Sequence, residues 1–251
     1  MRVSLLQFRS ELGAVDENFK RAARLINRSL IEKPDVIILP ELWSTGFYPK
    51  PPEEFADSEG QRTCEFLSTA ARNNHVNIVG GTVLVRDGDR LFNRNCVFDR
   101  NGECIALYDK IHLFSMSKEN EVFTAGNSLV HFDIDGVKCS VIVCYDLRFP
   151  ETARRLALDG AELLFIPAAW PLRRLEHWRI LTRARAIENQ FFVAAVNGAG
   201  HSMLINPWGE VLLEGDSDEA VLTSEIDLNA RKKIGETMNV FADRNALIDR
   251  V

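Results

Sequence analysis

The chain has 251 residues, of which 46% are apolar and 26% charged, and its formal net charge is −6. This composition is typical of a globular protein with a sizeable core, and the negative charge argues against a nucleic-acid-binding protein. No apolar run has the length of a membrane span, and the run in MRVSLLQFRSE meets a charge too early for a signal peptide. The five cysteines are odd in number and contain no CxxC pair, which favours a cytoplasmic protein whose thiols are mostly buried over a disulfide-bonded or zinc-binding one.

Apolar and amphipathic segments alternate in the first part of the chain. Val3 to Phe8 and Val36 to Leu39 are predicted strands. Between them, the spacing of apolar residues predicts a helix that begins after an N-cap at Asp16 and ends before Pro34. A second helix is predicted within Glu59 to Arg72.

Further predicted strands are rich in Val and Ile and are bounded by Gly, Pro or Asn. Some of them, such as LLFIP, are apolar throughout, which is typical of strands covered on both faces. These strands are Val76 to Val85, Leu91 to Phe98, Cys104 to Tyr108, Val137 to Val143, Leu163 to Ile166, Phe191 to Val196, Met203 to Ile205, Val211 to Leu213 and Ala220 to Ile226.

Two more helices are predicted in the second half. One begins at Pro150, a favourable first helical residue, and ends at Gly160. The other runs from about Leu172 to Asn189, with a core-facing stripe that includes Trp178 and Ile187, and its arginines are interpreted as a solvated face. Because no repeat or long linker is present, we expect one domain over residues 1–251, of the α/β class, with one or two mixed sheets.

Motifs of nucleotide and metal chemistry are absent from the sequence. There is no GxxxxGK[ST] loop, no GxGxxG after a strand, no HExxH and no GxSxG. The five histidines show no metal-ligand spacing. The sequence therefore disfavours a nucleotide-dependent or metal-dependent enzyme.

Cys144 stands where a reactive thiol is expected. It directly follows the predicted strand that ends at Val143, and a helix begins soon afterwards at Pro150. Reactive groups in α/β proteins gather at the carboxyl ends of strands, and nearby backbone N–H groups favour a thiolate. The alternative is an inert buried cysteine, the commoner role of a free thiol.

Two other polar residues follow apolar strands in the same way. Glu41 comes just after VIILP and is a candidate general base, and Lys110 ends IALYDK and is a candidate fixed charge for an oxyanion. The backbone N–H of Tyr145 is a second candidate oxyanion donor. Taken singly, Glu41 could be a surface carboxylate and Lys110 could extend to solvent. Together with Cys144 they predict a thiol nucleophile with its base and stabiliser.

Three segments, in this order, resemble the nitrilase superfamily of carbon–nitrogen hydrolases: LPELWSTGF, YDKIHLF and VCYDLRFPE. IVGGTV, HWRILTRARAIENQFFVAAVN and GHSMLINPWGE extend the resemblance over nearly the whole chain. It implies a four-layer α-β-β-α sandwich with two mixed β-sheets flanked by helices, a homodimer, and no cofactor or metal. It also implies a catalytic triad of Glu41, Lys110 and Cys144, with a second glutamate at Glu119.

Within the superfamily, CYDLRFPE, AAWPLRRLEHW and RARAIENQ look most like the ω-amidase branch, which hydrolyses α-keto acid amides such as 2-oxoglutaramate. An anionic substrate needs a clamp, for which Arg148 is the candidate, and Tyr145 and Trp170 are expected to line the pocket. The alternative for Arg148 is a structural ion pair with Asp146 or Glu151.

Two departures from the family pattern stand out. Asn197-Gly198-Ala199 runs almost straight into GHS, where the family usually has about ten more residues, and such loops shape pockets. Asn206 replaces the usual Asp before Pro-Trp-Gly, a change that keeps the turn chemistry.

The resemblance implies a thiol-dependent amidohydrolase that releases ammonia from a small carboxylated amide through a Cys144 thioester. Three alternatives remain open. The first is an amidase for deaminated glutathione or another small aliphatic amide. The others are a catalytically inactive binding module and a papain-like thiol enzyme with His112 as its base.

Overall fold

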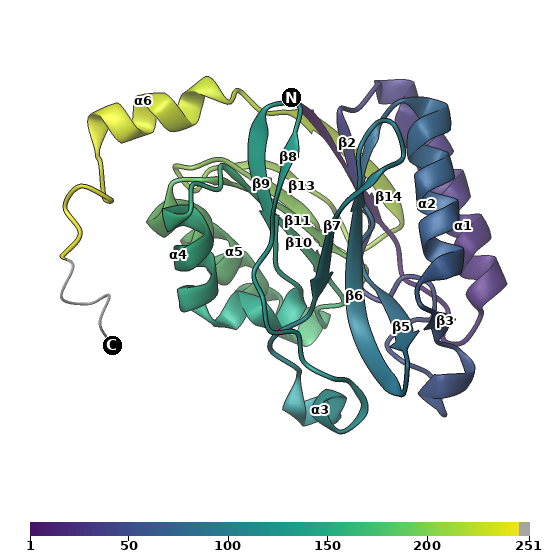
Figure 1. Ribbon diagram of the computed structural model, residues 1–251. Helices are drawn as coiled ribbons and strands as arrows, with labels where there is room; N and C mark the ends of the chain where they lie inside the picture. The colour runs from purple at the N-terminus through teal and green to yellow at the C-terminus, as the bar shows by residue number, and fades with distance from the viewer. Residues whose placement is uncertain (246–251) are drawn as a thin grey trace.

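Two β-sheets packed face to face between layers of helices make up the computed structural model, which describes residues 1–245 (Figure 1). Helices α1 (Val15–Ser29) and α2 (Gln61–Asn74) cover the first sheet. Helices α4 (Pro150–Leu158) and α5 (Leu175–Asn189) cover the second. The α/β class and the four-layer α-β-β-α sandwich are therefore as predicted.

The first sheet has eight strands in the order β14-β1-β2-β4-β6-β5-β3, with β7 also paired to β6. It is mixed, because β1 runs parallel to β2 and antiparallel to β14. Its strands are β1 (Arg2–Gln7), β2 (Val36–Ile38), β3 (Asp57–Ser58), β4 (Asn77–Val79), β5 (Val83–Asp87), β6 (Arg90–Phe98), β7 (Cys104–Asp109) and β14 (Ala220–Glu225).

The second sheet has six strands in the order β13-β12-β11-β10-β9-β8. It is also mixed, since β10 runs parallel to β9 and β11, whereas β12 runs antiparallel to β11. Its strands are β8 (His131–Ile134), β9 (Val137–Val141), β10 (Leu163–Ala168), β11 (Phe192–Asn197), β12 (Met203–Ile205) and β13 (Val211–Glu214).

Short helical segments complete the described chain. Two are α-helices, α3 (Glu119–Val122) and α6 (Asn229–Thr237). Five are 3-10 turns: η1 (Leu30–Glu32), η2 (Pro52–Glu54), η3 (Ser115–Ser117), η4 (Cys144–Arg148) and η5 (Leu172–Arg174).

One hydrophobic cluster joins the inner faces of the two sheets. It contains Val3 and Val36 from the first sheet together with Val141 and Phe165 from the second. Strands β10 and β11 are buried along their whole length, which explains why their sequences are apolar without alternation. Burial of this apolar surface is the main force that holds the sheets together.

Several predicted boundaries were wrong. The strand predicted over Val76 to Val85 is two strands, because the chain turns at Gly80 and Gly81. Asp16 is not an N-cap, since α1 begins at Val15 after Ala14. Strands β3 and β8 and helices α3 and α6 were not predicted.

The buried face of α5 differs from the predicted stripe. Trp178 is buried as expected, but Ile187 is 44% exposed, and polar residues including Thr182 and Arg185 are buried instead. The interpretation of the arginines as a solvated face fails at Arg185, which donates hydrogen bonds to the carbonyl of Leu147. Here tertiary hydrogen bonds override the apolar pattern.

The cysteines are free, and Cys96, Cys139 and Cys144 are buried, in line with the expectation for most of them. Cys64 is half-buried and Cys104 is exposed. Among residues 1–245, no helix is both long and apolar enough to cross a membrane.

The turn at Gly81 supports the segment that carries Glu41. Gly81 has a φ of +64°, and a Cβ added there would lie 2.1 Å from the carbonyl oxygen of Pro40. We expect Gly81→Ala to lower the free energy of unfolding by at least about 2 kcal/mol, because the backbone must move.

Gly88→Ala is the matched control for this change. Its φ is +58°, but an added Cβ would meet nothing within 4 Å, so only the cost of a left-handed conformation, about 1 kcal/mol, applies. Denaturant unfolding of both variants measures the difference, and equal losses would contradict the steric explanation.

Candidate active site

Glu41, Lys110 and Cys144 meet where strands of the two sheets end. Glu41 follows β2 and Lys110 follows β7, both of the first sheet, whereas Cys144 follows β9 of the second. Their exposed fractions are only 3%, 1% and 8%. The structure therefore brings the three predicted residues together, and the site depends on both sheets.

Lys110 lies between two carboxylates. Its Nζ donates hydrogen bonds of 2.8 Å to Oε1 of Glu41 and 2.8 Å to Oε2 of Glu119. Burial would lower the pKa of Lys110, but the charges of Glu41 and Glu119 outweigh it and raise that pKa above its ordinary value. Lys110 is thus held as a permanent cation beside the thiol.

Glu119 opens helix α3 and is fully buried. Besides Lys110, its carboxylate accepts a hydrogen bond of 2.7 Å from the backbone N–H of Phe114. Since it contacts Lys110 directly, Glu119 positions the lysine.

The backbone at Cys144 makes a tight turn. Cys144 has a φ of +46°, a left-handed conformation that costs a residue with a Cβ about 1 kcal/mol or more, and it begins the 3-10 turn η4. The backbone N–H groups that open such a turn, including that of Tyr145, have no partner within the helix.

The thiol of Cys144 is held in its protonated form. Burial raises its pKa well above its ordinary value, the charge of Glu41 raises it further, and Lys110 lowers it only in part. A hydrogen bond from the thiol to Glu41 acts in the same direction as burial, whereas the N–H of Ala169 favours the thiolate. This arrangement suits a carboxylate that accepts the thiol proton during the reaction.

Asn93 was missed by the sequence analysis. This buried residue of β6 donates to Oε1 of Glu41 and to Oε1 of Glu119, at 3.0 Å each, and so bridges the two carboxylates. The other oxygen of Glu41 accepts from the N–H of Ala169 at 2.9 Å. Asparagine inside the apolar strand LFNRNCVF was the available signal.

Asp146 was considered only as a partner for Arg148, yet it connects the lysine and cysteine segments. Its buried carboxylate accepts hydrogen bonds from the Tyr108 hydroxyl at 2.7 Å, the His112 N–H at 2.8 Å and the Val143 N–H at 2.8 Å. These donors flank Lys110 on one side and Cys144 on the other. Asp146 therefore fixes how the two segments lie relative to each other.

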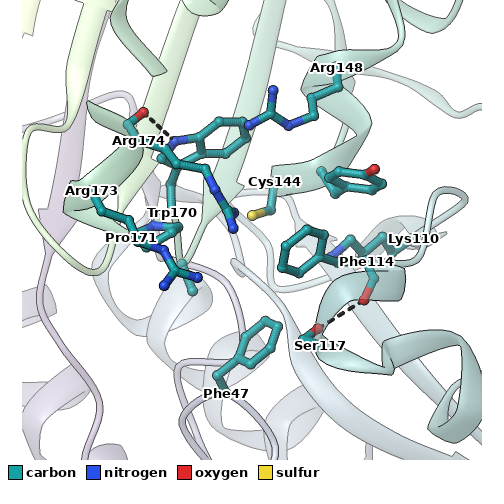
Figure 2. A pocket seen from close by; sticks show the side chains of 12 residues that line it. Phe47, Lys110, Phe114, Ser117, Cys144, Arg148, Trp170, Pro171, Arg173 and Arg174 are labelled. Carbon is teal, nitrogen blue, oxygen red and sulfur yellow. Dashed lines mark hydrogen bonds between the residues drawn. The ribbon is translucent and has the colours of Figure 1, made fainter. Parts of the chain in front are cut away.

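A cavity of about 240 Å³ opens onto the thiol (Figure 2). Tyr145, Arg148 and Trp170, the three predicted pocket residues, are among those that line it. Three arginines and no aspartate or glutamate are in this lining, so the cavity is cationic. The full lining is Phe47, Lys110, Phe114, Ser117, Cys144, Tyr145, Arg148, Ala169, Trp170, Pro171, Arg173 and Arg174.

The structural ion pair considered for Arg148 is not formed. Within residues 1–245, its guanidinium contacts neither Asp146 nor Glu151; it lies 4.7 Å from the Trp170 ring centroid and its Nη2 lies 3.2 Å from Nδ1 of His177. Arg148 thus remains available to an anionic ligand at the cavity wall.

The short connection after β11 is stabilised by Asn197. Its side-chain oxygen accepts from the N–H of Trp170 at 2.8 Å, and its amide donates to the carbonyl of Gly200 at 2.7 Å. This turn thereby also holds Trp170 in the cavity wall.

Comparison with known proteins settles the family. The sequence model for carbon–nitrogen hydrolases matches residues 2–235. The chain belongs to this family. It is 42% identical over 250 residues to the 2-oxoglutaramate amidase of Bacillus subtilis, with 96% of each chain covered. It is 30% identical over 264 residues to the omega-amidase NIT2 of Homo sapiens, with 98% of this chain and 95% of the relative covered.

A solved structure gives the same result. The hydrolase superposes on XC1258 of Xanthomonas campestris, a CN-hydrolase superfamily protein with an arsenic adduct in its active site, with a TM-score of 0.91 and 29% identity. The match covers 98% of this chain and 97% of the other. The protein is therefore an enzyme of the nitrilase superfamily that hydrolyses carbon–nitrogen bonds, and its amidase relatives support amides as the bonds cleaved.

Titration of the hydrolase tests the state of its thiol. Because burial and Glu41 raise its pKa, Cys144 should still be a thiol at pH 9.0, where an ordinary cysteine is half ionised. In Glu41→Gln the pKa should fall, since one negative charge is lost while Lys110 stays charged. The readout is the ultraviolet thiolate absorbance of each protein minus that of its Cys144→Ala counterpart. Ionisation of Cys144 below pH 9.0 in the unmodified enzyme would contradict a raised pKa of this thiol.

Proposed function

We propose that the protein releases ammonia from the terminal amide of a small carboxylated substrate, such as an α-keto acid ω-amide, through a thioester on Cys144. The observation that carries this proposal is the buried cluster in which Cys144 donates to Glu41 beside the cationic Lys110. The names of the Bacillus and human relatives support the substrate class.

The first half of the reaction forms the thioester. Sγ of Cys144 attacks the amide carbon while Glu41 takes the thiol proton. Lys110 and the N–H of Tyr145 donate to the oxyanion of the tetrahedral intermediate, whose charge is stabilised most strongly by such fixed donors. The carbon–nitrogen bond then breaks, Glu41 gives its proton to the nitrogen, and ammonia leaves.

The second half releases the acid. Glu41 takes a proton from a water molecule as the water oxygen attacks the thioester carbon. The same donors stabilise the second oxyanion. The carbon–sulfur bond breaks, the thiolate regains its proton from Glu41, and the carboxylic acid departs.

The surrounding residues keep this geometry. Glu119 and Asn93 fix Lys110 and Glu41 by direct hydrogen bonds, so neither catalytic group has to be ordered during the reaction. Arg148, with Tyr145 and Trp170 beside it, supplies the charged wall for an anionic substrate.

The geometry does not favour a papain-like enzyme with a histidine base. His112 lies 2.8 Å from Asp146 through Nδ1 and stacks on Phe149, with ring centroids 3.7 Å apart. None of the residues that line the cavity is a histidine. The intact buried cluster likewise argues against an inactive binding module.

Other expectations from the sequence stay predictions. They are one domain over residues 1–251, a cytoplasmic location and a homodimer.

For the homodimer we propose an interface formed by the outer face of α5 and the adjacent β12–β13 segment. There Ile187, Trp208 and Leu212 are 44%, 50% and 40% exposed. A monomeric mass in light scattering would contradict this.

An ammonia-release assay tests the proposed function. The unmodified enzyme should hydrolyse 2-oxoglutaramate, and Cys144→Ala should lose activity by at least about 10⁴-fold, because no nucleophile remains. Cys139→Ala, which removes a buried thiol outside the cavity, is the control and should retain turnover.

The alternative substrate is tested in the same assay series. The cavity is small, so deaminated glutathione should be cleaved less efficiently than 2-oxoglutaramate. A preference for deaminated glutathione would make it the proposed substrate in place of 2-oxoglutaramate. Turnover by Cys144→Ala would overturn the mechanism.

A further inference from the structure

Three arginine side chains line the cavity without an acidic partner. Lys110, at the base of the cavity, forms ion pairs with two glutamates. Within residues 1–245, however, Arg148, Arg173 and Arg174 form no ion pair with a carboxylate. By contrast, Arg94 and Arg100 each pair with two aspartates. The cavity therefore holds positive charge that its own residues do not neutralise.

Arg174 is the best placed of the three. It is half-buried at the end of η5, and its guanidinium lies 5.1 Å from the ring centroid of Phe114. Its backbone is fixed because its carbonyl accepts a hydrogen bond of 2.8 Å from Nε1 of Trp170. In Figure 2 its side chain points toward Cys144. Arg173, in contrast, is exposed and has no aromatic partner among the described residues.

Arg148 completes the arrangement from another element. It stands at the end of η4, and its guanidinium is stacked on Trp170, the same residue whose indole anchors the backbone of Arg174. Two half-buried arginines, each lying over an aromatic ring, thus line one cavity.

Stacked arginines are well suited to bind a carboxylate. A ring over one face of the guanidinium leaves the N–H groups at its edge for hydrogen bonds to a carboxylate. At Arg148 one of these groups, Nη2, lies 3.2 Å from Nδ1 of His177. Stacking also restricts the side chain before a ligand arrives, so less entropy is lost on binding. Partial burial keeps the charge from being fully screened by water.

We propose that Arg174 is a specificity-determining residue that, together with Arg148, binds the carboxylate at the far end of the amide substrate. This inference rests on the proposed function and deepens it. With the amide carbon held at Cys144 and the carboxylate held at the arginines, the site selects ω-amides by both charge and chain length. Neutral amides of the same length lack the second anchor.

The test compares two amides of equal chain length, glutaric acid monoamide, which carries a carboxylate, and pentanamide, which does not. Arg174→Gln should lower kcat/KM for the monoamide by about 10- to 100-fold, the usual effect of losing hydrogen bonds to a charged group. It should leave kcat/KM for pentanamide nearly unchanged. Arg174→Lys should recover part of the loss, because the charge returns without the paired donors.

Arg90→Gln is the matched control, since Arg90 is stacked on Phe92 at 5.2 Å but lies outside the cavity. Arg90→Gln should leave kcat/KM unchanged for both amides. An equal loss for both amides in Arg174→Gln, or an unchanged preference for the charged one, would overturn the inference.

A binding measurement separates failure of this inference from failure of the proposed function. If the unmodified enzyme hydrolyses neither these amides nor 2-oxoglutaramate, the proposed function is wrong, and calorimetric binding of glutarate still tests the arginine site. Weaker binding to Arg174→Gln than to the unmodified protein supports the site. Equal binding, or no binding to either, contradicts it.

Discussion

The active site depends on one buried ion network, in which the ammonium of Lys110 is neutralised by Glu41 and Glu119. A lone charge at this depth would cost several kcal/mol, and removing one partner from such a network leaves another charge uncompensated. The network is therefore stable only if the side chains of Lys110, Glu41 and Glu119 are all in place. Asn93 bridges both carboxylates, and backbone N–H groups of Ala169 and Phe114 donate to their other oxygens.

The fold brings these residues together from separate places. Glu41 and Lys110 follow strands of the first sheet, and Glu119 begins a short helix beyond β7. Cys144 comes from the second sheet, so its thiol meets the carboxylate of Glu41 only because the two sheets pack on a common core. Asp146 adds a local connection, since its carboxylate binds donors that flank both Lys110 and Cys144.

Much of this was accessible from the sequence, because strand ends and apolar runs are local features. Apolar patterning predicted an α/β protein and placed Glu41, Lys110 and Cys144 at strand ends, whereas the four layers were implied by the family resemblance that three spaced motifs carry. Asn93 and the organising role of Asp146 were not found, since a buried polar residue reveals its partners only after folding. The buried face of α5 was misjudged because Arg185 is buried by a hydrogen bond to a distant carbonyl, which no periodicity shows.

The central claim is that Cys144 becomes acylated by the amide substrate. It is tested most directly by mixing the enzyme with 2-oxoglutaramate, quenching in acid within the first turnovers and measuring the mass of the intact protein. The account predicts an added mass equal to the substrate less ammonia, located on the peptide that contains Cys144 and absent from Cys144→Ala. Steady turnover with no acylated protein at any quench time, or an adduct on another residue, would contradict it.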